Sequence, residues 1–200
     1  MIDQLIEKDK NLLIYLNNLG TEFFDPIFMY ITHQINWWPF FLLLMYLLLK
    51  KISLKQFGLL VLTLTAFFFF TDQMTNVVKY SVGRLRPVND PEILTQIRYL
   101  RGAGSPSFFS GHASNSSGSI LLVFLILRKY YRFAWIIFFF PLLFAYTRIY
   151  LALHYPIDII CGYIFGISSG FMFYYIYKLL NNKLNLVDKI NQQTHNNTPN

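Results

Sequence analysis

Three short stretches of the chain, residues 79–87, 110–112 and 147–158, combine reactive or charged side chains and lie at the ends of long apolar segments. Six of their side chains are the candidates for a common site, namely three cations, two histidines and one carboxylate: Lys79, Arg86, Arg148, His112, His154 and Asp158. Burying such groups costs free energy unless they are paired or bind a ligand. We therefore expect the three stretches to form one functional site.

The three cations indicate an anionic ligand with several oxygens. A phosphoryl group accepts hydrogen bonds at each of its oxygens, and Lys and the forked guanidinium of Arg can donate them. Gly111 allows the backbone to approach such a group closely, and a helix that begins near Ala113 would direct its free N–H groups at the anion. This pattern favours a phosphate-binding site.

A histidine and a carboxylate in the third stretch could form a nucleophilic pair. His154 and Asp158 are four residues apart, so the carboxylate can orient the imidazole. Tyr155 precedes Pro156, which disfavours helix at Tyr155 and allows Pro156 to begin one. We expect His154 at the mouth of this helix and Asp158 in or near its first turn. Together with the cations, the pair indicates phosphoryl transfer through a histidine nucleophile.

The composition indicates that a membrane surrounds the elements that hold this site. Apolar residues make up 54% of the 200-residue chain and charged residues only 14%, against about 25% in a soluble domain. A soluble enzyme and a disordered chain are poor fits, and the single cysteine, Cys161, excludes an intrachain disulfide and a cysteine-based zinc site. The net charge of +7 does not indicate nucleic acid, because cytoplasmic loops of membrane proteins are rich in Lys and Arg.

The chain is predicted to be an all-α, polytopic transmembrane bundle of five to six spans with an N-terminal interfacial helix. Five apolar segments approach the length that crosses a bilayer: residues 37–49, 57–79, 114–127, 133–153 and 156–180. Pro141 would kink the fourth, and residues 22–34 are either a second interfacial segment or a sixth, broken span. The domains are then 1–35, interfacial amphipathic helices; 36–180, the transmembrane core; and 181–200, a polar, disordered cytoplasmic tail. In the first, Asp3, Glu7, Lys8 and Lys10 should face water.

The basic residues predict the orientation of the bundle. Residues 50–55, 128–132 and 178–189 contribute nine Lys and Arg side chains to one face, which we expect to be cytoplasmic. An odd number of spans separates these loops from each of the three polar stretches. The site should therefore face the periplasm or the exterior of a bacterial plasma membrane.

Several other polar and small residues have two interpretations each. Asp72 lies on a polar helical stripe with Asn76 and Lys79, and it either supports Lys79 or forms an interhelical hydrogen bond. Arg84, Arg98 and Arg101 either contact a substrate headgroup or are ordinary solvated charges. The glycines at positions 162, 166 and 170 predict close helix packing, either within one chain or between chains.

The order Lys-x6-Arg-Pro, Ser-Gly-His and Arg-x5-His-x3-Asp resembles the type-2 phosphatidic acid phosphatase superfamily, whose membrane members are lipid phosphate phosphatases. The pattern spans Lys79 to Asp158. Phe109 stands where this family often has Pro, and Thr147 stands where Ser is common. Neither difference removes a reactive group.

The resemblance implies a role for each residue of the pattern. His154 would attack phosphorus to form a phosphohistidine, Asp158 would orient it, and His112 would protonate the leaving alkoxide and later activate water. The phosphate would be held by Lys79, Arg86, Ser110, Gly111 and Arg148. No metal and no cofactor are expected.

The implied protein is an integral membrane phosphatase that hydrolyses a lipid phosphate or diphosphate at the outer face. Its substrate would be undecaprenyl diphosphate, phosphatidylglycerol phosphate, phosphatidic acid or a lipid A phosphate. The alternatives are a lipid-linked phosphotransferase and a non-catalytic anion-binding or transport protein. Its expected partners are the lipid substrate and the bilayer, with no nucleic acid, and its oligomeric state stays open.

Overall fold

The computed structural model describes residues 1–186, and all regular elements within this range are helical. The α-helices are α1 Ile2–Asn18, α2 Asp25–Ile31, α3 Trp38–Leu49, α4 Leu54–Val82, α5 Gly111–Leu127, α6 Phe139–Tyr150 and α7 Pro156–Lys183. Short 3-10 segments cover Gln34–Trp37, Pro87–Asn89, Leu94–Gln96 and Ala134–Phe138. The all-α prediction is confirmed. Residues 187–200 of the predicted polar tail lie outside the described range.

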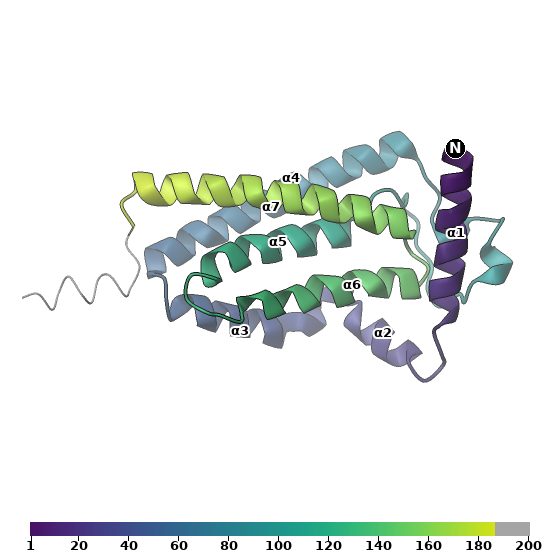
Figure 1. Ribbon diagram of the computed structural model, residues 1–200, viewed down its shortest axis with the longest axis horizontal. Helices are drawn as coiled ribbons and strands as arrows, with labels where there is room; N and C mark the ends of the chain where they lie inside the picture. Colours follow the sequence, from purple (N-terminus) through teal and green to yellow (C-terminus); the bar gives the residue numbers. More distant parts are fainter. Residues whose placement is uncertain (187–200) are drawn as a thin grey trace, which may run out of the picture.

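Helices α3 to α7 run along the long axis of the molecule, and α1 crosses one end of this bundle (Figure 1). Helices α4 and α6 end there, and α5 and α7 begin there. The loops that carry the three polar stretches therefore meet at this end, next to α1. The basic loops 50–53 and 128–133 lie at the opposite end. The structure therefore gathers the predicted site at one end of the bundle.

Helices occupy the positions of all five predicted spans. Within residues 1–186, the helical segments that begin at Leu54 and at Pro156 are the two long and apolar enough to cross a membrane by length and composition. The other three apolar segments are shorter: Gln34–Leu49, Gly111–Leu127 and Ala134–Tyr150. The number of segments that cross the bilayer stays a prediction. Helix α2 has seven residues, about 10 Å at 1.5 Å per residue, which is too short for a sixth span.

Helix α4 has a local signal at each end. Ser53 and Gln56 form a capping box at its start, in which each side chain pairs with the backbone of the other residue. At its end Gly83 adopts a left-handed conformation with φ +65°, which favours glycine. The turn stops the helix just after Lys79 and sends the chain into the loop that carries Arg86.

Two details of the bundle differ from the predictions. Pro141 was expected to kink a continuous helix, but it lies in the first turn of α6, after the 3-10 segment. A proline there sacrifices no helical hydrogen bond. Lys10 was expected to face water, but its ammonium pairs with Asp90 at 2.8 Å and with Glu92 at 2.5 Å.

Helices α5 and α7 approach each other through the three glycines of α7. A Cβ atom on Gly162 would lie 2.6 Å from the Ser110 carbonyl oxygen, and one on Gly170 would lie 2.7 Å from that of Gly118. Only glycine permits this distance between the backbones. The predicted close packing is confirmed, and it occurs within one chain.

This contact predicts the effect of one added methyl group. In Gly166→Ala the new Cβ would lie 2.7 Å from the Ser114 Cα, so α5 and α7 must separate. We expect a loss of about 1–3 kcal/mol in unfolding free energy, measured by thermal unfolding of the purified protein in detergent. Gly58→Ala is the matched control, since no atom lies within 4 Å of its added Cβ. Equal melting temperatures for the two variants would contradict this account of the contact.

Candidate active site

His154 and Asp158 meet where α7 begins. His154 is 1% exposed, and its Nδ1 atom lies 3.5 Å from Asp158 Oδ2. Tyr155 is extended, Pro156 occupies the first turn, and Asp158 Oδ2 accepts a hydrogen bond of 2.9 Å from the Tyr155 N–H. The predicted start of this helix is confirmed. It places the carboxylate against Nδ1 and leaves Nε2 to face the rest of the site.

Arg86 lies on the open side of His154. Its Nη1 atom is 3.4 Å from His154 Nε2 and donates to the Leu153 carbonyl at 3.0 Å. The Ser105 carbonyl and hydroxyl accept from its Nε and Nη2 atoms at 2.6 and 2.9 Å. Burial lowers the pKa of the Arg86 guanidinium. These neutral acceptors hold the guanidinium in place without neutralising its charge.

Lys79 and Arg148 complete a cluster of buried cations. Both are 8% exposed, and Arg148 donates to the Thr32 hydroxyl while its Nε atom has no hydrogen-bond partner. Among residues 1–186, neither these two nor Arg86 forms an ion pair with a carboxylate. Three buried cations without such a partner need a bound anion to offset their desolvation.

The first turn of α5 supplies His112 on the other side of this cluster. His112 interacts electrostatically with Lys79, Arg86, Arg148 and His154. Its ring lies 5.3 Å from the ring of Phe144. The structure thus brings together all six of the charged or ionisable residues predicted for the site.

Ser110 and Gly111 form the entry to α5. Ser110 is fully buried, and its hydroxyl accepts the Ala113 N–H at 3.3 Å as the N-cap. At Gly111 a Cβ would lie 3.3 Å from the Thr75 methyl group. Their predicted contacts with phosphate remain predictions, whereas the structural role of Ser110 as a cap is visible.

The sequence analysis missed a hydroxyl at the centre of the site. Ser107 donates a hydrogen bond to Asp158 Oδ2 and lies 3.4 Å from His154 Nδ1. Thr32, which binds Arg148, was missed as well. Both residues lie outside the regular helices, where no periodicity reveals which way a side chain points.

The three outer arginines have different surroundings. Arg84 bridges Asp158 and Asp9, with both contacts at 2.7 Å. Arg98 forms a forked pair with Asp25 at 2.7 and 2.8 Å. Arg101 is exposed and interacts electrostatically with Arg148. Arg84 and Arg98 are therefore structural ion pairs rather than free headgroup contacts.

Asp72 forms an interhelical hydrogen bond, which is the second of its two interpretations. Asp72 Oδ1 accepts from Asn115 Nδ2 at 2.7 Å, and Asn115 Oδ1 accepts from Thr71 at 2.6 Å. Asp72 is exposed, although it lies well inside the apolar helix α4.

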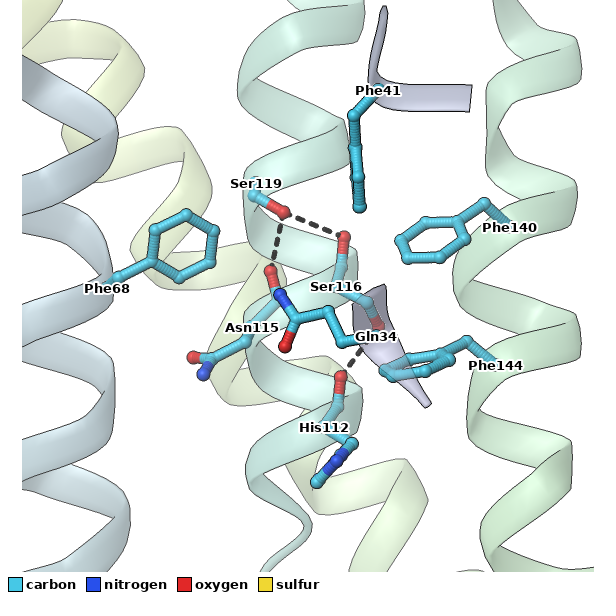
Figure 2. A pocket seen from close by; sticks show the side chains of 9 residues that line it. All are labelled: Gln34, Phe41, Phe68, His112, Asn115, Ser116, Ser119, Phe140 and Phe144. Carbon is cyan, nitrogen blue, oxygen red and sulfur yellow. Dashed lines mark hydrogen bonds between the residues drawn. The ribbon is translucent and has the colours of Figure 1, made fainter. Parts of the chain in front are cut away.

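A groove leads from His112 along the bundle between α3, α4, α5 and α6. Figure 2 shows His112, Asn115, Ser116 and Ser119 along α5, with the aromatic rings of the other helices around them. The groove continues into a cavity of about 260 Å³ whose further lining is apolar: Leu44, Leu64, Ile120 and Val123. Its polar end is therefore at His112, and it becomes more apolar with distance from the site.

Comparisons with known proteins identify the family of the chain. The PAP2 superfamily model matches residues 56–182. Lipid A 4'-phosphatase from Bacteroides thetaiotaomicron is 34% identical over 184 residues, covering 88% of this chain and 80% of that protein. Lipid A 4'-phosphatase from Porphyromonas gingivalis is 26% identical over 179 residues, covering 88% of this chain and 75% of that protein.

Two solved structures share the fold. A transmembrane PAP2-type phosphatidylglycerolphosphate phosphatase from Bacillus subtilis superposes with a TM-score of 0.66 at 18% identity, covering 90% of this chain and 87% of that one. LpxE from Aquifex aeolicus gives a TM-score of 0.60 at 22% identity, covering 82% of this chain and 92% of that one. The family pattern, the matched range and the fold coincide on the same residues, and the chain belongs to the PAP2 superfamily.

Proposed function

We propose that this phosphatase hydrolyses a lipid phosphomonoester through a phosphohistidine on His154. The observation that carries the proposal is the charge distribution of the site. Within residues 1–186, three buried cations without a carboxylate ion pair gather at a histidine whose Nδ1 atom faces Asp158 and whose Nε2 atom lies beside Arg86. Such a cluster stabilises the charge of a phosphoryl group in the transition state.

In the first step, the lone pair of His154 Nε2 attacks phosphorus, and the bond from phosphorus to the lipid oxygen breaks. Burial lowers the pKa of the His154 imidazole to about 4, so the lone pair is free at neutral pH. Asp158 orients the ring and offsets the positive charge that the phosphohistidine acquires. His112 donates a proton to the leaving alkoxide.

In the second step, His112 takes a proton from water as the water oxygen attacks phosphorus. The bond between phosphorus and Nε2 breaks, inorganic phosphate leaves, and both histidines return to their starting states. Lys79, Arg86 and Arg148 hold the phosphoryl oxygens in both steps, so the residues of the chain supply the charge stabilisation that the reaction needs.

The groove beside His112 would hold the lipid part of the substrate. The alkoxide must leave on the side of its proton donor, and the groove begins there. Its increasing apolar character away from the site suits a hydrocarbon chain. Lateral entry from the bilayer would then bring the headgroup to the cations.

Among the four candidate lipids, we propose a lipid A phosphate as the preferred substrate. Two relatives carry the name lipid A 4'-phosphatase. The Gln34 amide lines the groove, and Asp72 lies next to it, where its Oδ1 atom binds the lining residue Asn115. Asp72 Oδ2 has no hydrogen bond within residues 1–186, so both side chains can offer an oxygen to a hydrogen-bond donor. An acylated amino sugar carries amide and hydroxyl donors near its phosphate. The diacylglycerol part of phosphatidic acid and a polyprenyl chain carry none, and phosphatidylglycerol phosphate carries a single hydroxyl.

The alternatives predict other products. A phosphotransferase would pass the phosphoryl group from His154 to an acceptor other than water, without releasing inorganic phosphate. A protein that only binds or transports anions would need the cations but not the pairing of His154 with Asp158. This pairing favours a catalytic site.

We also propose that the site faces the periplasm or the exterior of a bacterial plasma membrane. The site and the basic loops lie at opposite ends of the bundle (Figure 1). The positive-inside rule places the basic end in the cytoplasm.

The first prediction concerns the nucleophile. We expect His154→Ala to release phosphate at less than about 0.1% of the wild-type rate, because no other side chain replaces Nε2. Asp158→Asn should retain more activity, since orientation is lost but the nucleophile remains. Phosphate release and gel filtration in detergent would test both. A well-folded His154→Ala protein with a few per cent activity would disprove the mechanism.

The second prediction concerns the substrate. Phosphate release should be faster with lipid A than with phosphatidic acid, phosphatidylglycerol phosphate or undecaprenyl diphosphate. Asp72→Leu should lower kcat/KM for lipid A about tenfold, the value of one hydrogen bond to a charged group, and should change phosphatidic acid hydrolysis less than twofold.

Gln73→Leu is the control for this panel, since Gln73 is exposed on the same helix and, unlike Asp72, has no hydrogen bond to a residue that lines the groove within residues 1–186. If no lipid releases phosphate, the proposed function is wrong. If Asp72→Leu slows all lipids equally, only the proposed substrate is wrong.

The third prediction concerns sidedness. Asn89 and Lys129 are both exposed and lie in loops at opposite ends of the bundle. In a Cys161→Ala background, an impermeant thiol reagent on intact cells should label a cysteine at position 89 and spare one at position 129. The reverse labelling pattern would place the site in the cytoplasm.

A further inference from the structure

We propose that Arg84 and Asp9 form a positioning pair that holds the Asp158 carboxylate against His154. Asp9 belongs to α1, the helix that crosses this end of the bundle. The inference rests on the proposed role of Asp158 and goes beyond it, because it makes α1 part of the catalytic apparatus. The pair joins three segments that are far apart in the sequence: α1, the loop after α4 and the first turn of α7.

The guanidinium of Arg84 is shared between two buried carboxylates. Its Nη1 atom donates to Asp158 Oδ1 and its Nη2 atom to Asp9 Oδ2, both at 2.7 Å. Asp158 and Asp9 are 0% and 3% exposed. Although burial opposes its charge, Asp158 and Asp9 raise the pKa of the Arg84 guanidinium.

The second oxygen of Asp9 binds the backbone of α7. Asp9 Oδ1 accepts the Ile157 N–H at 2.9 Å, and this N–H belongs to the first turn, where a helix has no internal acceptors. Asp9 thus fixes both the helix that carries Asp158 and the cation that binds it. A carboxylate at a helix N-terminus is also stabilised by the helix dipole.

These contacts leave Asp158 one orientation. Its Oδ1 binds Arg84, and its Oδ2 accepts from Ser107 and from the Tyr155 N–H while facing His154 Nδ1. Without Arg84, Oδ1 would be a buried, unpaired charge, and the carboxylate could lower its energy by rotating or taking up a proton. The Asp158 carboxylate accepts from Nδ1 and so selects the tautomer whose Nε2 lone pair is free to attack. Either change removes this acceptor.

Arg84 itself is held by the ring of Tyr155. The guanidinium carbon lies 3.9 Å from the ring centroid, a cation–π contact. The Tyr155 hydroxyl donates to Asp90 at 2.7 Å, and Asp90 pairs with Lys10 at 2.8 Å. Helix α1 therefore docks on the site through two neighbouring side chains, but only the Asp9 branch binds Asp158 through Arg84.

This division between the two branches supplies a matched control. Arg84→Met removes the bridge, Asp9→Asn keeps a side chain that can accept from Ile157 but loses the charge, and Lys10→Gln loosens α1 without touching Arg84. If Arg84 only docked α1, all three variants would have similar effects. If it positions Asp158, kcat should fall in the first two and stay within about twofold in Lys10→Gln.

The experiment is steady-state phosphate release by the full-length protein in detergent, with dioctyl phosphatidic acid and lipid A as substrates. For Arg84→Met we expect kcat to fall roughly ten- to a hundredfold, the usual cost of losing a partner that orients a reactive group. KM should change less than twofold, because Lys79, Arg86 and Arg148 still bind the phosphate. Arg84→Lys should recover part of kcat, since one ammonium can pair with Asp158.

A double variant isolates the coupling. In an Asp158→Asn background Arg84→Met should lower kcat less than threefold, because the group that it positions is already lost. Equal fold losses in both backgrounds, or a loss confined to KM, would refute the proposal while leaving the histidine mechanism intact. If Asp158→Asn itself leaves kcat unchanged, the proposed function fails instead.

Discussion

The structure of the site depends on satisfying one buried carboxylate. Asp158 is fully buried and lies in the first turn of α7, where it binds the backbone at Tyr155, the hydroxyl of Ser107 and the guanidinium of Arg84. Each partner comes from a different part of the chain, so the loop before α5, the loop after α4 and the start of α7 must meet at this point. His154 receives its orientation from the same oxygen that caps the helix. A buried charge with this many partners is costly to displace, and it fixes the geometry around it.

The cations of the site fall into two groups with opposite roles. Arg84, Lys10 and Arg98 each pair with carboxylates and hold the N-terminal segment onto the bundle. Lys79, Arg86 and Arg148 are held by neutral hydroxyl and carbonyl groups or by packing, so their charges remain available to an anion. Because the carboxylates pair with the first group of cations, the second group stays unpaired at one point of a chain whose net charge is +7. Arg84 belongs to the first group and still borders the second, because it pairs with Asp9 of α1 and with Asp158 beside His154.

The backbone contact between α5 and α7 makes this arrangement rigid. The glycines of α7 let the two helices approach until backbone meets backbone, and both helices begin at the site. His112 therefore has a fixed position relative to Asp158, although the two residues are on different helices. The same approach leaves the opposite side of α5 open toward α3 and α4, where the groove of Figure 2 lies. One face of α5 thus packs closely against α7, while another face lines the groove.

The sequence by itself determined the helical segments, the glycine packing face and the residues of the reactive set, because these depend on composition and on local spacing. Proline after an extended residue is common at the start of a helix, so the positions of His154 and Asp158 at the start of α7 could be predicted from the sequence. The partners of the charged side chains were decided only by the tertiary structure. Arg84 and Arg86 are two residues apart in one loop, yet one bridges two carboxylates and the other lies beside His154. Asp158, which binds Arg84, and His154, which lies beside Arg86, are 74 and 68 residues away in the chain. Electrostatic pairing acts through space, so no local pattern distinguishes the two arginines.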